Sequence, residues 1–204
     1  MRAVSNRLPD NVRLALRRYF PSEVSARSAA YYALPEHLAL LRLRSEAENR
    51  MLRWTDVADD LRKSLKDLAV RVTETTAFSN SYAVDILLHE DVEFPETDEG
   101  LFEHLKAPVR TAHISASFLT SYWTIGFRRW RKNNRGDIVV RSVPQQGRHS
   151  TRVANLAKKV LTKHGWKKIP SNLAQTKIPG IDLRSVSRGE VRVADIVFGE
   201  NQSI

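Results

Sequence analysis

The stretch ISASFLTSYWTIGFRRWRKNNRGDIVVRSV, residues 114–143, decides the fold that the sequence predicts. It opens with a long run rich in β-branched and aromatic residues, which favour strands. The polar segment 132–136 follows, and its asparagines and glycine tolerate the positive φ of a hairpin loop. A second run, 137–143, ends before Pro144, which has no backbone N–H for a sheet. We therefore expect one long hairpin at the centre of a sheet.

Strand periodicity assigns the side chains of the first run to two faces. The two sets are Phe118, Tyr122 and Thr124 on one face, and Leu119, Trp123, Ile125 and Phe127 on the other. We expect the second set to lie in the core. Gly126 falls in the middle of the run, where a bulge or a close backbone approach is expected.

The segment before this run, residues 10–72, is predicted to be helical, with three or four helices. Asp10 and Thr55 are placed to act as N-caps. Apolar residues then recur at helical spacing along the last of these helices. They are Val57, Leu61, Leu65 and Leu68.

The remaining elements give an α+β class. We expect a strand at 78–88, an acidic loop at 89–99, a helical turn at 101–105, a helix from 151 to about 164, and a final strand at 191–198. The chain of 204 residues is predicted to be one α+β domain. In it, the N-terminal helices of residues 1–72 pack on residues 73–204, an antiparallel sheet with a long central hairpin and one C-terminal helix.

Charge is distributed unevenly along the chain, which has a net charge of +10. Residues 73–105 contain 9 Asp/Glu and no Lys/Arg, whereas residues 106–192 contain 19 Lys/Arg and 3 Asp/Glu. Such a balance favours acidic or polyanionic partners. Cysteine is absent, and no apolar run approaches the roughly 20 residues needed to cross a bilayer. We expect a cytoplasmic protein that does not enter a membrane.

Two basic elements are candidates for a nucleic-acid interface, because cations neutralise phosphates and aromatic rings stack on bases. We expect them to share one positive face. The candidate binding residues are Arg128, Arg129, Trp130, Arg131, Lys132 and Arg135 of the hairpin, with Lys158, Lys159 and Lys163 of the helix that follows. The alternative is that the aromatic residues belong to the core and the cations are solvated.

No motif for a cofactor, metal or catalytic site stands out. The chain has no glycine-rich phosphate loop and no H-E-x-x-H pattern. The set His89, Glu90, Asp91 and His104 is the best candidate for a divalent cation, but isolated surface histidines beside acids are commoner. A metal-free nuclease would need His113, His149, Arg128 and Arg141 as acid, base and charge stabilisers, and their spacing does not select that role. We predict no cofactor, no metal and no enzymatic activity.

The last third resembles bacterial immunity-type proteins of toxin–immunity systems. The resemblance rests on residues 163–170, 177–183 and 189–199, where an Ile-Pro-Gly-Ile loop leads into a closing strand. It implies a non-enzymatic protein that binds a cognate toxin, and it carries over no binding residues. The positive charge departs from the acidic character usual against basic nuclease toxins. The resemblance therefore implies either an acidic toxin or contact through the acidic loop 89–103.

Three functional hypotheses follow from the sequence, of which the last is an enzyme that acts on nucleic acid. The first is a cytoplasmic binding protein that neutralises a cognate toxin, or another acidic protein, by occlusion. The second is a basic protein that binds nucleic acid through the hairpin 122–143 and the helix 151–168. The sequence leaves the partner, the oligomeric state and the pathway open.

Overall fold

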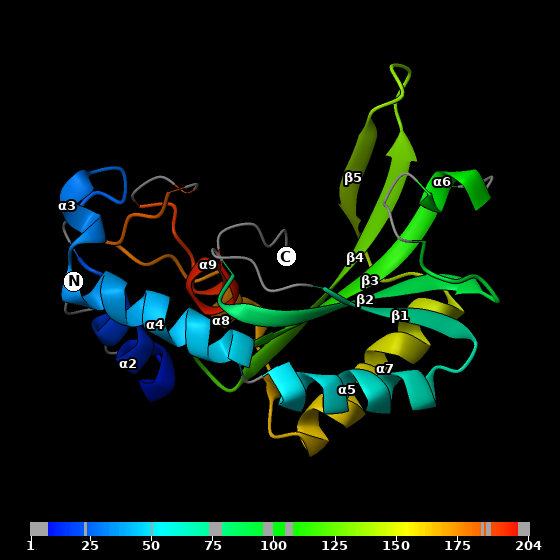
Figure 1. Cartoon of the computed structure of the whole chain (residues 1–204), viewed down its shortest axis with the longest axis horizontal. Coiled ribbons are helices and arrows are strands. Elements are labelled where there is room, and N and C mark those ends of the chain that lie inside the picture. Colours follow the sequence, from blue (N-terminus) through cyan, green and yellow to red (C-terminus); the bar gives the residue numbers. More distant parts are fainter. Residues whose placement is uncertain are drawn as a thin grey trace.

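The computed structural model describes residues 8–22, 24–49, 51–73, 79–95, 100–104, 108–184, 186 and 189–199. Its centre is a six-stranded sheet with helices around it, which confirms the α+β class (Figure 1). The strands are β1 (Leu68–Thr73), β2 (Ser81–Glu90), β3 (Val109–Ser117), β4 (Tyr122–Lys132), β5 (Ile138–Val143) and β6 (Lys167–Lys168). Strands β1 to β5 follow one another in antiparallel pairs, and β6 joins the start of β4 in parallel.

Eight helices or helical turns surround the sheet in the described residues. They are α2 (Asp10–Tyr19), α3 (Ala29–Tyr32), α4 (Pro35–Asn49), α5 (Met51–Ser64), α6 (Leu101–His104), α7 (Arg148–Lys163), α8 (Ser171–Ala174) and α9 (Val193–Phe198). Helices α5 and α7 run side by side under one face of the sheet (Figure 1).

The sheet face that α5 and α7 cover holds the main core. Alternate residues of the middle strands point to it, as the period of a strand requires. Trp54 of α5 is fully buried there, and its indole N–H donates to the carbonyl of Ala83 at 3.0 Å. Trp123 and Phe127 are buried on this face, as predicted, and Ile125 is half-buried.

The opposite face of the sheet carries two smaller apolar clusters. One lies under α9 and includes Ile196 and Phe198, with Leu119 and Tyr122 packed at its margin. The other contains Leu87, Val109, Trp130 and Leu101 of α6. Polar side chains of the middle strands lie on this same face and are described with the candidate site.

The central run is not a single strand, which corrects the prediction for 114–143. The chain turns at residues 118–121, so that β3 and β4 form one hairpin and β4 and β5 form a second. Ser117 fixes the turn, because its hydroxyl oxygen accepts from the backbone N–H of Leu119 and of Thr120. Leu119 therefore leaves the face of Trp123 and joins the cluster under α9. Gly126 lies in regular register with His113, without the expected bulge.

Strand β1 was predicted as helix and is the second correction. Helix α5 runs from Met51 to Ser64 without a new start at Thr55, whose hydroxyl donates to the carbonyl of Met51. From Leu68 onwards, β-branched residues alternate with others, and this segment pairs with β2. Leu68 falls at helical spacing from Leu61 and Leu65 by coincidence. The conformation of residues 68–73 is instead set by pairing with β2.

The third correction concerns the C-terminal segment, where 191–198 was predicted as a strand. The segment contains helix α9, and the Asp195 carboxylate accepts from the backbone N–H of Arg192 at 2.8 Å. Val193, Ile196 and Val197 are fully buried at helical spacing. The closing strand that the resemblance to immunity-type proteins implied is therefore absent from this segment.

The other predicted elements are close to the observed ones. Helix α7 begins at Arg148, three residues before the predicted start at 151, and it is followed by Gly165 at φ 90°. Strand β2 covers most of 78–88, and Phe78 lies outside the described residues. The turn at 101–105 is α6, and Leu105 likewise lies outside them.

Candidate functional site

The β4–β5 hairpin forms an arm, residues 127–143, that projects away from α5 and α7 (Figure 1). The side-chain oxygen of Asn133 accepts from the backbone N–H of Arg135 and of Asp137, at 2.8 and 2.9 Å. Gly136 adopts φ 85°, which glycine reaches without a steric penalty. These contacts hold the loop in the predicted hairpin conformation.

Three arginines form a row across the base of the arm, which we call the arginine row. Arg110 of β3 is opposite Arg129 of β4, which is opposite Arg141 of β5. All three are exposed, and no ion pair joins them to an acid in the described residues of the chain. Like charges directly opposite each other destabilise a sheet. The row is therefore unfavourable for folding alone and suits an anionic partner that offsets the repulsion.

The remaining cations of the arm point in different directions. Arg131 follows Arg129 on the same face, and Arg135 lies in the loop; both are exposed. Lys132 is on the opposite face, with its ammonium 5.5 Å from the ring centroid of Phe102. Arg128 is on that opposite face too and is half-buried. The predicted hairpin residues thus divide between two surfaces.

Trp130 is a core residue. Its side chain is 8% exposed in the cluster with Leu87 and Val109, and its indole N–H donates to the hydroxyl of Thr111 at 2.9 Å. Trp123 and Phe127 are also buried. These three rings therefore offer no face on which a base can stack, and the polar groups that the arm exposes are mainly its cations.

The predicted lysines of α7 do not join the arm. Lys158 and Lys159 are exposed on the helix, which lies on the far side of the molecule from the tip of the arm (Figure 1). Lys163 is engaged already, since its ammonium lies 2.7 Å from the Asp60 carboxylate. That hydrogen bond and one from His164 lower the pKa of Asp60 to about 2. The cations of the hairpin and those of α7 therefore do not form the single positive face that was expected.

A second candidate site is a polar band on the sheet face opposite α5 and α7. One row of it crosses four strands in direct register, from Arg71 through Asp85 and His113 to Gly126. The next row includes Thr73 and Ser115. Asp85, His113 and Ser115 are all buried.

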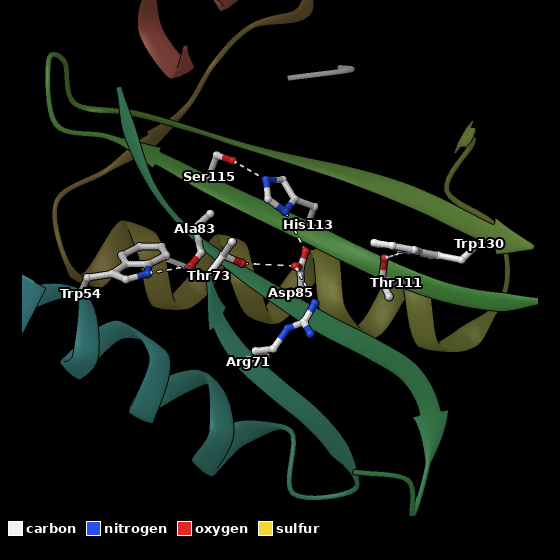
Figure 2. A network of polar contacts seen from close by, with 9 residues as sticks. All are labelled: Trp54, Arg71, Thr73, Ala83, Asp85, Thr111, His113, Ser115 and Trp130. Atoms are coloured by element: carbon white, nitrogen blue, oxygen red, sulfur yellow. Dashed lines mark hydrogen bonds and ion pairs between the residues drawn. The ribbon is translucent and has the colours of Figure 1, made fainter. Parts of the chain in front are cut away.

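Figure 2 shows that these side chains form a chain of contacts. His113 Nδ1 lies 2.7 Å from Asp85 Oδ1, and His113 Nε2 lies 3.0 Å from the Ser115 hydroxyl oxygen. The other Asp85 oxygen accepts from the Thr73 hydroxyl at 3.2 Å and lies 3.7 Å from the Arg71 guanidinium. An ionised Asp85 only accepts, so Nδ1 carries a proton, and in neutral His113 the Nε2 accepts from Ser115.

The electrostatics of the band favour an ionised Asp85. Burial alone raises the pKa of Asp85, but the His113 hydrogen bond and the charges of His113, Arg128 and Arg71 lower it below its ordinary value. Burial lowers the pKa of Arg128, and Asp85 partly opposes that effect. The carboxylate is thus balanced by cations on both sides.

The order Ser115, His113, Asp85 has the hydrogen-bond connectivity of a Ser-His-Asp catalytic triad. The Ser115 side chain is 0% exposed and His113 is 8% exposed, so a substrate has no route to the serine oxygen in this structure. Of the four residues required for a metal-free nuclease, His113 and Arg128 share this face, whereas Arg141 lies in the arginine row. The buried polar groups of Asp85, His113 and Ser115 therefore satisfy one another by hydrogen bonds within the band.

Sequence reasoning missed the band, although a signal was present. Residues 111–117 read Thr-Ala-His-Ile-Ser-Ala-Ser, in which polar and apolar side chains alternate strictly. This alternation is typical of a strand with one polar face. It does not show that the polar face is buried, nor that Asp85 lies opposite His113.

Three possible metal ligands, Asp67, Glu90 and His149, lie together at the edge of the sheet. The Arg152 guanidinium holds both oxygens of Asp67, at 2.5 and 2.6 Å. A metal ion would have to displace this charged pair. Of the set predicted from sequence, only Glu90 belongs to this group; His89 accepts from the backbone N–H of Arg110, and the side chain of His104 lies outside the described residues.

The chain matches no protein family, no curated protein and no solved structure. No helix in the described ranges combines the length and the apolar character needed to span a bilayer.

Proposed function

We propose that the protein binds nucleic acid through the arm, by contacts to backbone phosphates. The observation that carries the proposal is the arginine row, in which Arg110, Arg129 and Arg141 stand opposite one another without acidic partners among the described residues. Adjacent strands lie roughly 5 Å apart, so the three guanidinium groups start from closely spaced backbone positions. A phosphate backbone is the common polyanion whose charge density suits such a row.

Duplex nucleic acid fits the arm better than a single strand does. Single-strand binding proteins combine cations with exposed aromatic rings. In the arm, Trp130 and Phe127 are buried, so stacking contributes nothing. A two-stranded ribbon also has dimensions that a duplex groove admits. We therefore expect binding that depends on phosphates and shows little dependence on base sequence.

The test is a titration of a labelled duplex at several salt concentrations, with Arg110, Arg129 and Arg141 all changed to alanine. Each phosphate contact adds about 0.9 to the slope of log K against log salt, so the variant should lose nearly three units of slope. Its affinity at about 0.1 M salt should fall by about 100-fold or more. The matched control changes Lys158, Lys159 and Lys167, which removes three charges outside the arm.

The control should retain affinity within a few fold, because its lysines lie away from the arm. Equal losses in both triple variants would show that net charge alone attracts the nucleic acid, and would overturn the proposed role of the arm. Tighter binding of a single strand than of the duplex would overturn the choice of duplex.

A second candidate function is capture of a cognate toxin or another acidic protein by occlusion. One observation favours a protein partner: four large apolar side chains are exposed on the N-terminal helices. They are Leu14, Tyr32, Leu38 and Leu41. Leu38 and Leu41 lie three residues apart on α4 and therefore share one face of that helix. An exposed apolar patch is a mark of a protein-binding surface. Replacement of Leu38 and Leu41 by serine should abolish capture of such a partner in a pull-down, and the arm variant should retain it.

A further inference from the structure

A cleft of about 520 Å³ lies between the turn 118–121 and the adjoining ends of α5 and α7. Its size is within the range of small-molecule sites. Three aromatic rings line it, from Tyr82 of β2, Phe118 of the turn and Trp166 after α7. Asp56 of α5 and His164 line it too. The cleft lies outside both the arm and the polar band.

The aromatic rings of the cleft are fixed by contacts to one another and to the backbone. Tyr82 stacks on Trp54 with centroids 5.8 Å apart, and its ring is met edge-on by Phe118 at 5.6 Å. The Trp166 indole N–H donates to the carbonyl of Ser117, and the Tyr82 hydroxyl donates to that of Ala47. Tyr82 is 6% exposed, so it forms the floor of the cleft, whereas Phe118 and Trp166 are half-buried. Because the polar atoms of Tyr82 and Trp166 are already engaged, the half-buried rings of Phe118 and Trp166 can offer a ligand π surface but not hydrogen bonds.

The charge of the cleft is opposite to that of the chain. Asp56 is exposed, and no hydrogen bond or ion pair engages its carboxylate within the residues that the structure describes. No lysine or arginine belongs to the described residues that line the cleft. His164 is turned to Asp60, with Nε2 at 3.0 Å from its carboxylate. In a chain of net charge +10, the described lining of the cleft therefore presents the Asp56 carboxylate, unpaired among these residues, beside aromatic rings.

We propose that this cleft binds an organic cation, an alkylammonium or guanidinium group, between the aromatic rings and Asp56. Cations are attracted to the π faces of tryptophan, tyrosine and phenylalanine, and a carboxylate adds a direct charge partner. An anion would meet the Asp56 charge, and the described residues that line the cleft include no lysine or arginine to offset it. The cation can belong to a free small molecule or to a side chain of a partner protein, since both present the same group. The proposal is independent of nucleic-acid binding by the arm.

The test follows the Trp166 indole N–H signal by NMR during titration with choline. The neutral control is 3,3-dimethylbutan-1-ol, which has the shape of choline without its charge. Choline should shift the signal in a saturable way, and the alcohol should bind about three- to thirtyfold more weakly, as the strength of a cation–π contact requires. Equal binding of the two would overturn the cation assignment, as would the absence of any shift with choline and with the peptides described below.

Two variants locate the site. Asp56→Asn removes the charge partner from an exposed position, and Phe118→Leu removes a π face but keeps an apolar side chain. Each should weaken binding of the cation by about three- to thirtyfold. Glu48→Gln, which removes an exposed acid of α4, should leave it unchanged. Unchanged binding in Asp56→Asn would overturn the proposal even if Phe118→Leu fails to fold.

Two peptides distinguish the sources of the cation. A short peptide with one trimethyllysine and a second with one arginine are titrated beside choline. A peptide that binds more tightly than choline assigns the cleft to a partner side chain, and tighter binding of choline assigns it to a free small molecule. Both results support the cation site.

Discussion

The two ends of strand β4 differ in chemistry. At the C-terminal end, the arm exposes arginines that no ion pair joins to an acid in the described residues, and Phe127 and Trp130 are buried. At the N-terminal end, the turn 118–121 opens onto a cleft lined by Tyr82, Phe118 and Trp166, with the carboxylate of Asp56. The net charge of +10 thus has the sign of the arm and not that of the cleft. Phe118 and Trp166 stay half-buried at the cleft, whereas Phe127 and Trp130 of the arm are buried in the core.

The largest expected effect separates the roles of two neighbouring residues in the arm. Trp130→Ala should destabilise the protein by about 3–5 kcal/mol, because it empties a packed cluster and leaves the Thr111 hydroxyl without its partner. Urea unfolding measures this change. Arg129→Ala is the matched control, and it should alter stability by about 0.5 kcal/mol or less while it weakens duplex binding. A Trp130→Ala protein that is as stable as the wild type but no longer binds the duplex would show that Trp130 acts in binding and not in the core.

The second prediction concerns the polar band that lies between the two ends. Asp85→Asn should cost about 3–5 kcal/mol at neutral pH, because it leaves buried His113 and half-buried Arg71 and Arg128 without their carboxylate. The folded pKa of Asp85 is below its unfolded value, so its stabilising contribution is present above the unfolded value of 3.8. That contribution is lost as the pH falls through the folded value.

The difference in unfolding free energy between the wild type and Asp85→Asn should therefore shrink below about pH 4. Asp137→Asn provides the control, since Asp137 is exposed in the loop of the arm and makes no contact with the band. A difference that stays constant from neutral to acidic pH would show that Asp85 is not held ionised by the band.

The smallest effect on stability tests the arginine row, and it has opposite signs for folding and for binding. Arg141→Glu places an acid directly opposite Arg129, so it should stabilise the fold by about 0.2–1 kcal/mol. It should also weaken duplex binding at about 0.1 M salt by about eightfold or more. Urea unfolding and duplex titration on the same preparation measure both. A variant that is less stable than the wild type would show that the arginines do not repel one another.

Much of the fold could be predicted from local patterns. Helix α7 follows from apolar residues at helical spacing before Gly165, and the loop of the arm follows from Asn133, Asn134 and Gly136. In both cases the residues that determine the conformation lie within the element itself. Strand β1 and helix α9 were mispredicted because both are short, and neighbours distant in sequence decide their conformation.

The candidate sites divide in the same way. The sequence identified the cations of the hairpin, but it also assigned Trp130 and Lys163 to the binding surface. The structure buries Trp130 in the cluster with Leu87. It pairs the Lys163 ammonium with the Asp60 carboxylate. The aromatic cleft was not predicted, because Tyr82, Phe118 and Trp166 are spread over three separate elements.

By itself, the sequence determined which residue types are available: an excess of cations after residue 105, a strand-forming centre and an amphipathic helix after it. Only the tertiary structure decided which of them stand opposite one another. The arginine row joins residues 110, 129 and 141, and the polar band joins Asp85 to His113. Both depend on strand register, because a shift of one residue moves every side chain to the other face of the sheet.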